Sequence, residues 1–154
     1  MAARLKRRPD GNGTTGEHFL VRPARPADVP ALVVLERRCF GDPWSEASFR
    51  EAVGAGGSFG LLAEADGVLA GYLIARETAG SGEVLNLEVA PEQRRQGLAR
   101  SLLDAGLAAL AARGVTEVFL EVRASNAAAQ ALYAASGFRV AGVRAAYYRN
   151  PRED

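Results

Sequence analysis

The chain has 154 residues, of which 48% are hydrophobic and 24% charged, a composition that suits one globular domain with its own core. Its formal net charge of +1 gives no electrostatic reason to expect a nucleic-acid or membrane partner. A single cysteine, Cys39, excludes an internal disulfide, and a single histidine, His18, argues against a zinc site or a histidine-based triad. No apolar run approaches the ~20 residues of a membrane span, so we expect a cytoplasmic protein.

Residues 1–18 are polar and glycine-bearing, and they carry four basic side chains: Arg4, Lys6, Arg7 and Arg8. Gly11, Gly13 and Gly16 match the dinucleotide pattern G-x-G-x-x-G, but no strand precedes them and no helix follows, so we reject that interpretation. We predict a disordered basic tail over residues 1–18 and a folded domain over 19–154. Contact of the tail with ribosomal RNA is the alternative.

The folded part begins with a predicted strand over residues 19–24 and a helix over 28–40, where apolar residues recur at near-helical spacing. A second helix is predicted to start at Ser45, which is a good N-cap. Trp44 before the cap and Phe49 in the helix have the spacing of a hydrophobic staple. Trp44 could instead form the wall of a binding groove, and both interpretations stay open.

The middle of the chain has the pattern of an antiparallel meander. After a loop over residues 54–60, strands over 61–65 and 68–76 are joined by Asp66-Gly67, a strong two-residue hairpin signal. A turn over residues 78–82 then leads to a strand over 84–90.

The stretch around Gly97 has the features of an anion site. Pro91 ends the strand, a charged loop follows over residues 92–96, and Gly97 opens a helix with a leucine stripe from Leu98 to Leu110. The first N–H groups of a helix have no partner inside it, and the helix dipole adds positive potential there. Gly97 has no side chain, so a phosphate could approach its backbone closely.

Three more elements complete the predicted domain. Gly114 ends the long helix, and residues 116–122 form a strand that is apolar on both faces, as expected of a central strand. An alanine-rich helix over residues 126–136 is capped by Ser125 or Asn126, and residues 138–148 are extended. This order places helices against a mixed sheet.

Two sets of motifs resemble a known family. The run Gln93-Arg94-Arg95-Gln96-Gly97-Leu98-Ala99 resembles the pyrophosphate loop of the GNAT acetyltransferases, R/Q-x-x-G-x-G/A. Residues 120–126, which read LEVRASN, resemble RimI-type N-terminal acetyltransferases, as do Ala131-Leu132-Tyr133, Gly137-Phe138 and Pro43-Trp44-Ser45. The resemblance covers residues from about Phe19 to the C-terminus.

The resemblance implies a GNAT fold of the α/β (α+β) class, with a mixed, mostly antiparallel central sheet flanked by helices. It implies acetyl-CoA as co-substrate and no metal. The implied substrate is a protein N-terminus, the N-terminal alanine of a small-subunit ribosomal protein. Direct binding of nucleic acid or membrane is not expected.

The resemblance also assigns the residues that hold the cofactor. Backbone groups of Leu87, Glu88 and Val89 would pair with the pantetheine arm, and Asn126 matches the family's cofactor-binding asparagine. The pyrophosphate would lie on the loop and first helical turn: Arg94, Arg95, Gln96, Gly97, Leu98, Ala99 and Arg100. The alternatives are an ordinary solvated turn for the loop and a helix cap for Asn126.

Glu121 is the candidate general base. It lies within an apolar strand, where burial would raise its pKa toward neutrality, and it matches the glutamate that has this role in RimI-type enzymes. A structural glutamate paired with Arg123 is the alternative. Glu88 is a rival, because other acetyltransferases of the superfamily use a glutamate on this strand.

Tyr133 is the candidate general acid, since it matches the tyrosine that protonates the leaving thiolate in the family. A phenol, with a reference pKa near ~10, remains a proton donor at neutral pH. The alternative is a core aromatic residue. Tyr147, beside Tyr148, falls where the family has a tyrosine pair near the substrate peptide, and Trp44 is the second candidate for substrate binding.

The sequence departs from the family at its C-terminus. RimI-type chains continue past the stretch that matches residues 149–154 into one more apolar strand, so we expect the final strand of this fold to be missing. An unpaired sheet edge invites pairing with another copy, so we expect a monomer or a weak homodimer. Two other functions stay open: acetylation of a small-molecule amine, and a non-catalytic acyl-CoA-binding regulatory module.

Overall fold

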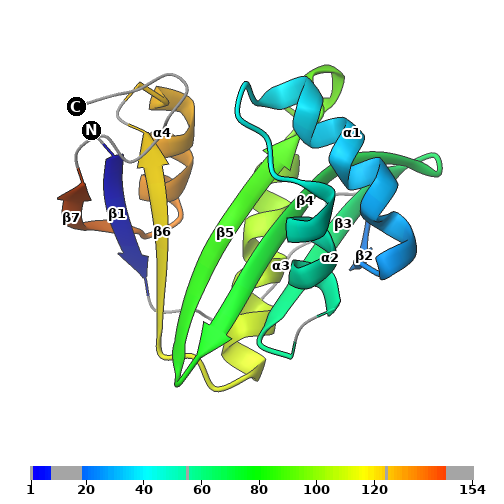
Figure 1. The fold of residues 1–154 in the computed structure, drawn as a ribbon. Coiled ribbons are helices and arrows are strands. Elements are labelled where there is room, and N and C mark those ends of the chain that lie inside the picture. Colours follow the sequence, from blue (N-terminus) through cyan, green and yellow to red (C-terminus); the bar gives the residue numbers. More distant parts are fainter. Residues whose placement is uncertain (1, 8–18, 55, 124, 145–154) are drawn as a thin grey trace.

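A mixed, seven-stranded sheet forms the centre of the computed structural model, which describes residues 2–7, 19–54, 56–123 and 125–144 (Figure 1). The strands lie in the spatial order β2-β3-β4-β5-β6-β1-β7. Their bounds are β1 Ala2–Arg7, β2 Leu20–Pro23, β3 Ser58–Ala65, β4 Val68–Thr78, β5 Ser81–Val89, β6 Glu117–Arg123 and β7 Arg139–Arg144. All neighbouring pairs are antiparallel except β5 and β6, which confirms the predicted mixed, mostly antiparallel sheet.

Helices cover both faces of this sheet, and a separate hydrophobic cluster lies beneath each layer. Their bounds are α1 Val29–Cys39, α2 Glu46–Gly54, α3 Leu98–Ala112 and α4 Ala127–Ala135, with short 3-10 turns at Pro26–Asp28 and Pro91–Gln93. Leucines of α3 and Tyr133 of α4 belong to one cluster, whereas residues of α1 and α2 belong to the other, with Tyr72 and Ile74 of β4. Figure 1 shows α1 and α2 in front of the sheet and α3 behind it. Within the described ranges the longest helix has 15 residues, and none could span a membrane.

The predicted meander is confirmed, but its strands are longer than expected. Asp66 and Gly67 form the hairpin turn with positive φ angles of 51° and 76°. The prediction of a loop over residues 54–60 is wrong at its end, because β3 starts at Ser58, which pairs with Arg76. The next turn is correspondingly tight, and β5 starts at Ser81. Backbone pairing with a neighbouring strand extends these elements beyond their apolar residues.

The prediction of a disordered tail is wrong for residues 2–7. These residues form β1, which lies antiparallel between β6 and β7 and pairs with both. Strand pairing supplies partners for backbone N–H and C=O groups whatever the side chains are, which explains how a basic segment can form a central strand. Residues 8–18, and residues 145–154, where the last strand was expected to be missing, lie outside the described part.

A divergence of two strands creates the space for a site. β5 and β6 pair only at their starts, Ser81 to Val84 against Glu117 to Leu120, and then separate (Figure 1). At this point β5 also has an irregularity in its pairing with β4, because Ile74 pairs with Asn86 and Ala75 pairs with Val84. The extra residue, Leu85, is a β-bulge, a feature that locally re-aims side chains.

Candidate active site

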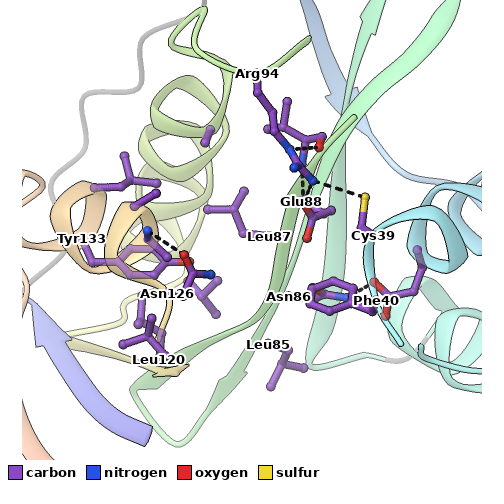
Figure 2. A pocket seen from close by; sticks show the side chains of 18 of the residues that line it. Cys39, Phe40, Leu85, Asn86, Leu87, Glu88, Arg94, Leu120, Asn126 and Tyr133 are labelled. Carbon is purple, nitrogen blue, oxygen red and sulfur yellow. Dashed lines mark hydrogen bonds and ion pairs between the residues drawn. The ribbon is translucent and has the colours of Figure 1, made fainter. Parts of the chain in front are cut away.

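The cleft between the separated ends of β5 and β6 has a volume of about 1300 Å³. Its walls come from α1, the α1–α2 loop, β5, the start of α3, β6 and α4. It brings together most of the predicted site residues: Trp44, Leu87, Glu88, Val89, Arg94, Arg95, Gly97, Leu98, Ala99, Arg100, Glu121, Asn126 and Tyr133. Gln96 is exposed beside it, and Tyr147 lies outside the described residues. Figure 2 shows Glu88, Arg94 and Asn86 on one side, Asn126 and Tyr133 on the other, and Leu87 between them.

The start of α3 presents backbone donors to this cleft. Gly97 is the N-cap residue in the left-handed conformation, with φ 78°, and no side chain caps the helix. A Cβ placed on Gly97 would meet nothing within 4 Å, so the backbone opens onto free space. Arg95 also has a positive φ, of 64°, which is uncommon for a residue with a side chain and clusters at ligand-binding sites. The uncapped N–H groups and the helix dipole fit a diphosphate.

The three predicted arginines differ in their surroundings. Arg94 donates from Nε to the Val89 carbonyl oxygen at 3.1 Å, and its Nη2 forms an ion pair with Glu88 Oε1 at 3.2 Å. Arg100 is paired with Asp104 one helical turn away, at 3.2 Å. Arg95 has no ion pair with the described part of the chain, so its charge remains available for a phosphate.

Glu88 faces the α1 side of β5, whereas Leu87 and Val89 belong to the cluster beneath α3, because successive side chains of a strand point to opposite faces. Burial raises the pKa of Glu88 above its ordinary value, although a hydrogen bond from the Val89 N–H and the nearby Arg94 charge oppose this. The Arg94 guanidinium also lies 3.7 Å from the Cys39 sulfur. Burial raises the pKa of this thiol to about 11, so Cys39 remains a neutral thiol near neutral pH.

Glu121 and Tyr133 approach the cleft from the opposite side. Glu121 is half-buried on β6, with its Oε2 atom buried, while its neighbours Leu120 and Val122 point into the core. Tyr133 on α4 is only 8% exposed and packs edge-on against Phe138, with ring centroids 5.7 Å apart. Tyr133 is therefore both a core aromatic residue and a residue of the cleft wall.

Asn126 has the predicted capping role at the start of α4. Its Oδ1 atom accepts a hydrogen bond from the Ala129 N–H at 3.0 Å. Because the oxygen is used by the helix, the amide nitrogen is the end left for the cleft (Figure 2).

Trp44 forms the predicted hydrophobic staple and also lies at the cleft. Ser45 Oγ accepts from the Ser48 N–H at 3.1 Å, which confirms Ser45 as the cap of α2. The Trp44 ring lies 5.3 Å from that of buried Phe49, as a hydrophobic staple requires. Trp44 also lines the cleft, so the staple fixes a part of the cleft wall.

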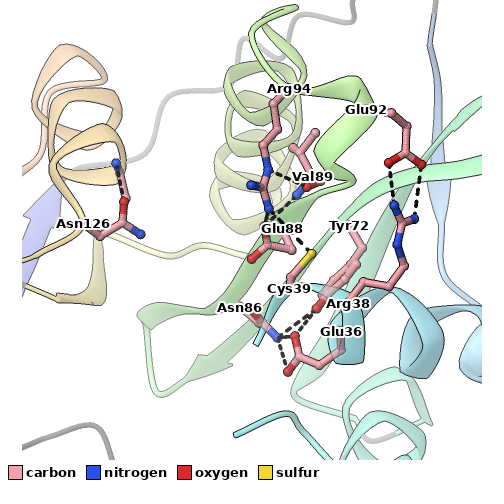
Figure 3. A network of polar contacts seen from close by, with 11 residues as sticks. Glu36, Arg38, Cys39, Tyr72, Asn86, Glu88, Val89, Glu92, Arg94 and Asn126 are labelled. Carbon is pink, nitrogen blue, oxygen red and sulfur yellow. Dashed lines mark hydrogen bonds and ion pairs between the residues drawn. The ribbon is translucent and has the colours of Figure 1, made fainter. Parts of the chain in front are cut away.

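Sequence reasoning missed a buried polar network around Glu36 (Figure 3). Glu36 is only 1% exposed, and its carboxylate accepts hydrogen bonds from the Tyr72 hydroxyl, the Asn86 amide and the Trp44 N–H. Both Glu36 and Asn86 line the cleft. The available signal was the position of Glu36 within the apolar stripe of α1, four residues after Leu32. A carboxylate on such a stripe requires buried partners.

The cleft contains groups that can attract either charge. The α3 terminus with Arg95 attracts anions, whereas the carboxylates of Glu36, Glu88 and Glu121 can attract a cationic amine. Titratable groups on both sides could accept or donate a proton. The described residues contain no cluster of three or more His, Cys, Asp or Glu side chains suited to a metal ion.

Comparisons with known proteins agree with this geometry. Residues 29–138 match the acetyltransferase (GNAT) family. The chain is 40% identical over 129 residues to the ribosomal protein bS18-alanine N-acetyltransferase of Escherichia coli, which covers 82% of this chain and 86% of the relative. The crystal structure of the Escherichia coli ribosomal-protein-S18-alanine N-acetyltransferase superposes with a TM-score of 0.81 at 36% identity, covering 88% of each chain. The PaiA N-acetyltransferase of Thermoplasma acidophilum, solved with coenzyme A, shares the fold at 19% identity, with a TM-score of 0.74 over 82% of this chain and 92% of that one.

Proposed function

This chain belongs to the acetyltransferase (GNAT) family and is an acetyl-CoA-dependent N-acetyltransferase, and we propose that it acetylates the N-terminal α-amino group of a protein. The presence of an uncapped helix terminus and of the carboxylates of Glu88 and Glu121 in one cleft carries this proposal. The coenzyme's phosphates are anionic and an α-ammonium is cationic, so the helix terminus suits the phosphates and the carboxylates suit the amine. The volume of the cleft, about 1300 Å³, also leaves room for the end of a peptide.

The proposed substrate is the N-terminal alanine of a small-subunit ribosomal protein. Support comes from the relative in Escherichia coli, whose name states an alanine of ribosomal protein bS18 as the acetylated residue and whose match covers most of both chains. Trp44, held by its contact with Phe49, would form part of the peptide-binding wall.

The residues at the start of α3 fit the phosphates of acetyl-CoA. The N–H groups of Gly97 and the first turn of α3 would receive the diphosphate, and Arg95 would add a positive charge. The backbone of β5 from Leu87 to Val89 would pair with the pantetheine arm, and the Asn126 amide would donate to it. Bound acetyl-CoA supplies the activated acetyl group.

Proton transfer is proposed to involve both sides of the cleft. Glu121 would accept a proton from the substrate's ammonium group, and the neutral nitrogen would then form the new bond to the acetyl carbon as the carbon–sulfur bond breaks. The second proton that the nitrogen loses in becoming an amide balances the one that the thiolate gains. Tyr133 would donate its phenolic proton to the departing thiolate. Direct attack needs no covalent enzyme nucleophile, so Cys39, whose thiol remains protonated, has no chemical role in this scheme.

The kinetics of paired carboxamide variants test this assignment. With a saturating alanine-terminated peptide, Glu121→Gln should lower kcat by about a hundredfold or more, as loss of a general base does. The affinity for acetyl-CoA, measured by calorimetry, should not change. Glu88→Gln removes the rival carboxylate on the other wall and should lower kcat much less than Glu121→Gln does. The opposite pattern would assign the base role to Glu88.

A further inference from the structure

We propose that Asn86 binds the substrate's amino group through its side-chain carbonyl oxygen, and that Glu36 is the positioning residue that fixes this orientation. The inference rests on the proposed N-terminal acetyltransferase function. It concerns two residues of the cleft that lie on β5 and α1 and that the proton-transfer scheme does not use.

The first step is the orientation of the Asn86 amide. Its Nδ2 atom lies 3.1 and 3.3 Å from the two carboxylate oxygens of Glu36 and 3.2 Å from the Tyr72 hydroxyl (Figure 3). The two Glu36 oxygens accept from the Trp44 N–H and the Tyr72 hydroxyl, so they present acceptors to Asn86 and the NH₂ end of the amide faces Glu36. A flipped amide would place its carbonyl oxygen against two carboxylate oxygens, which is electrostatically unfavourable.

The second step is the saturation of the network. The Tyr72 hydroxyl donates to Glu36 and accepts from Asn86, so it supports the same orientation. The Trp44 N–H donates to the other Glu36 oxygen at 2.8 Å. Tyr72 and Glu36 are 0% and 1% exposed, so water does not compete for these bonds. Both amide hydrogens of Asn86 are therefore engaged by protein acceptors.

The third step concerns the carbonyl oxygen of Asn86, the end of the side chain that the network does not use. Asn86 is half-buried and lines the cleft, and its Oδ1 atom accepts no hydrogen bond from the described part of the chain. The bulge at Leu85 contributes to this geometry, because it places Asn86 on the side of β5 that faces α1. The cleft thus receives a hydrogen-bond acceptor whose own donors are already satisfied.

An oriented acceptor at this place is suited to an amine. Asn86 lies next to Leu87, where the coenzyme's pantetheine arm is proposed to pair with β5, so it lies near the expected acetyl group. A hydrogen bond from the amine to Oδ1 would hold the nitrogen with its lone pair free to attack. Glu88, two residues farther along the strand, adds negative charge that favours binding of the substrate amine in its cationic form.

The variants Asn86→Ala, Glu36→Gln and the double variant test the proposal with acetyl-CoA and an alanine-terminated peptide. Asn86→Ala should lower kcat/KM for the peptide by about ten- to a hundredfold, as loss of a hydrogen bond to a charged group does. The KM for acetyl-CoA should not change. Glu36→Gln should cause a similar loss, because a glutamine amide can face the carbonyl of Asn86 and allow it to flip.

The double variant separates positioning from structural support. If Glu36 acts through Asn86, adding Glu36→Gln to Asn86→Ala should cause no further loss of kcat/KM for the peptide. Losses that multiply would show that Glu36 acts independently and would overturn its role. Tyr72→Phe preserves the ring volume and should also loosen the amide, which keeps the test valid if Asn86→Ala fails to fold. Full activity in a folded Tyr72→Phe protein would then contradict the role of the network.

Two controls identify what a failure means. Glu83→Gln, on the same strand but outside the cleft and paired with Arg76, should leave the peptide kinetics unchanged. The second control is a peptide whose first peptide nitrogen is methylated, and Asn86→Ala should lower kcat/KM for it by the same factor. If the effect of Asn86→Ala disappears with this peptide, the contact is made by the peptide N–H, which would overturn our assignment to the amine. Absence of acetylation by the wild-type protein would refute the proposed function itself, whereas wild-type kinetics in Asn86→Ala would refute only this inference.

Discussion

Arg94 and Glu88 form an ion pair across the edge of the cleft, with 3.2 Å between Nη2 and Oε1. Arg94 is half exposed, whereas only 15% of the Glu88 side chain is accessible, so the pair joins a solvated cation to a buried carboxylate. The attraction of the Arg94 charge does not compensate for the burial of the Glu88 carboxylate, so the pKa of Glu88 remains raised. Arg94 is thereby directed toward Glu88 and the Cys39 thiol, whereas Arg95 has no such partner among the residues that the structure describes.

The raised pKa of Glu88 predicts a specific pH dependence of stability. The folded state binds this proton more tightly than the unfolded chain, so the free energy of unfolding falls as the pH rises from about 4.5 through the folded-state pKa. Glu88→Gln mimics the neutral acid and should raise Tm at neutral pH. This gain in Tm should vanish below about pH 4.5, where Glu88 of the wild-type protein is protonated in both the folded and the unfolded state. Thermal unfolding across this range checks it, and a gain that is independent of pH would contradict the explanation.

Gly97→Ala should weaken coenzyme binding. The residue has φ 78°, so a side chain would cost about 1–2 kcal/mol of stability, and its Cβ would occupy the space in front of the backbone donors. We expect the Kd for coenzyme A to rise by about tenfold or more, as loss of a hydrogen bond to a phosphate would cause. Isothermal titration calorimetry measures this.

Gly114→Ala is the matched control for Gly97→Ala. Gly114 lies just after the other end of α3, with φ 83°, and a Cβ there would also meet nothing within 4 Å. It should cause a similar loss of stability while leaving coenzyme affinity intact. Equal affinities in the two variants would mean that the start of α3 does not hold the diphosphate.

Tyr133→Phe should separate packing from chemistry. The edge-on contact with Phe138 needs only the ring, so the fold should be retained. Loss of a general acid should lower kcat by about a hundredfold or more and remove the alkaline limb of the pH–rate profile. Steady-state kinetics as a function of pH test this, and an unchanged alkaline limb would leave Tyr133 as a core residue alone.

Local signals allowed much of this fold to be predicted from the sequence. Asp66-Gly67 specified a turn because positive φ angles are needed there, and Ser45 specified a helix start because its hydroxyl can cap. The position of β1 could not be predicted, because it depends on pairing with strands more than a hundred residues away. Glu36 and Asn86 were missed for a similar reason, since their meaning depends on a contact between α1 and β5, which are 50 residues apart at this point.

Lys6→Pro tests the N-terminal strand. Lys6 pairs along the backbone with Phe119 of β6 and Arg139 of β7, and proline cannot donate a ladder hydrogen bond. Hydrogen exchange should show loss of protection in residues 139–144, because β7 pairs within the described residues only with β1. Lys6→Ala is the control and should keep this protection, as should β3 in both variants. Unchanged protection in Lys6→Pro would contradict the pairing.

The most direct test of the proposed function is to locate the transferred acetyl group. The protein is incubated with acetyl-CoA and two peptides, one with a free alanine N-terminus and one with a blocked N-terminus and an internal lysine, and mass spectrometry locates the label. We predict acetylation of the alanine α-amino group alone, and its loss in Glu121→Gln. Acetylation of the lysine, or of neither peptide while acetyl-CoA still binds, would contradict the assignment of a protein N-terminus as substrate.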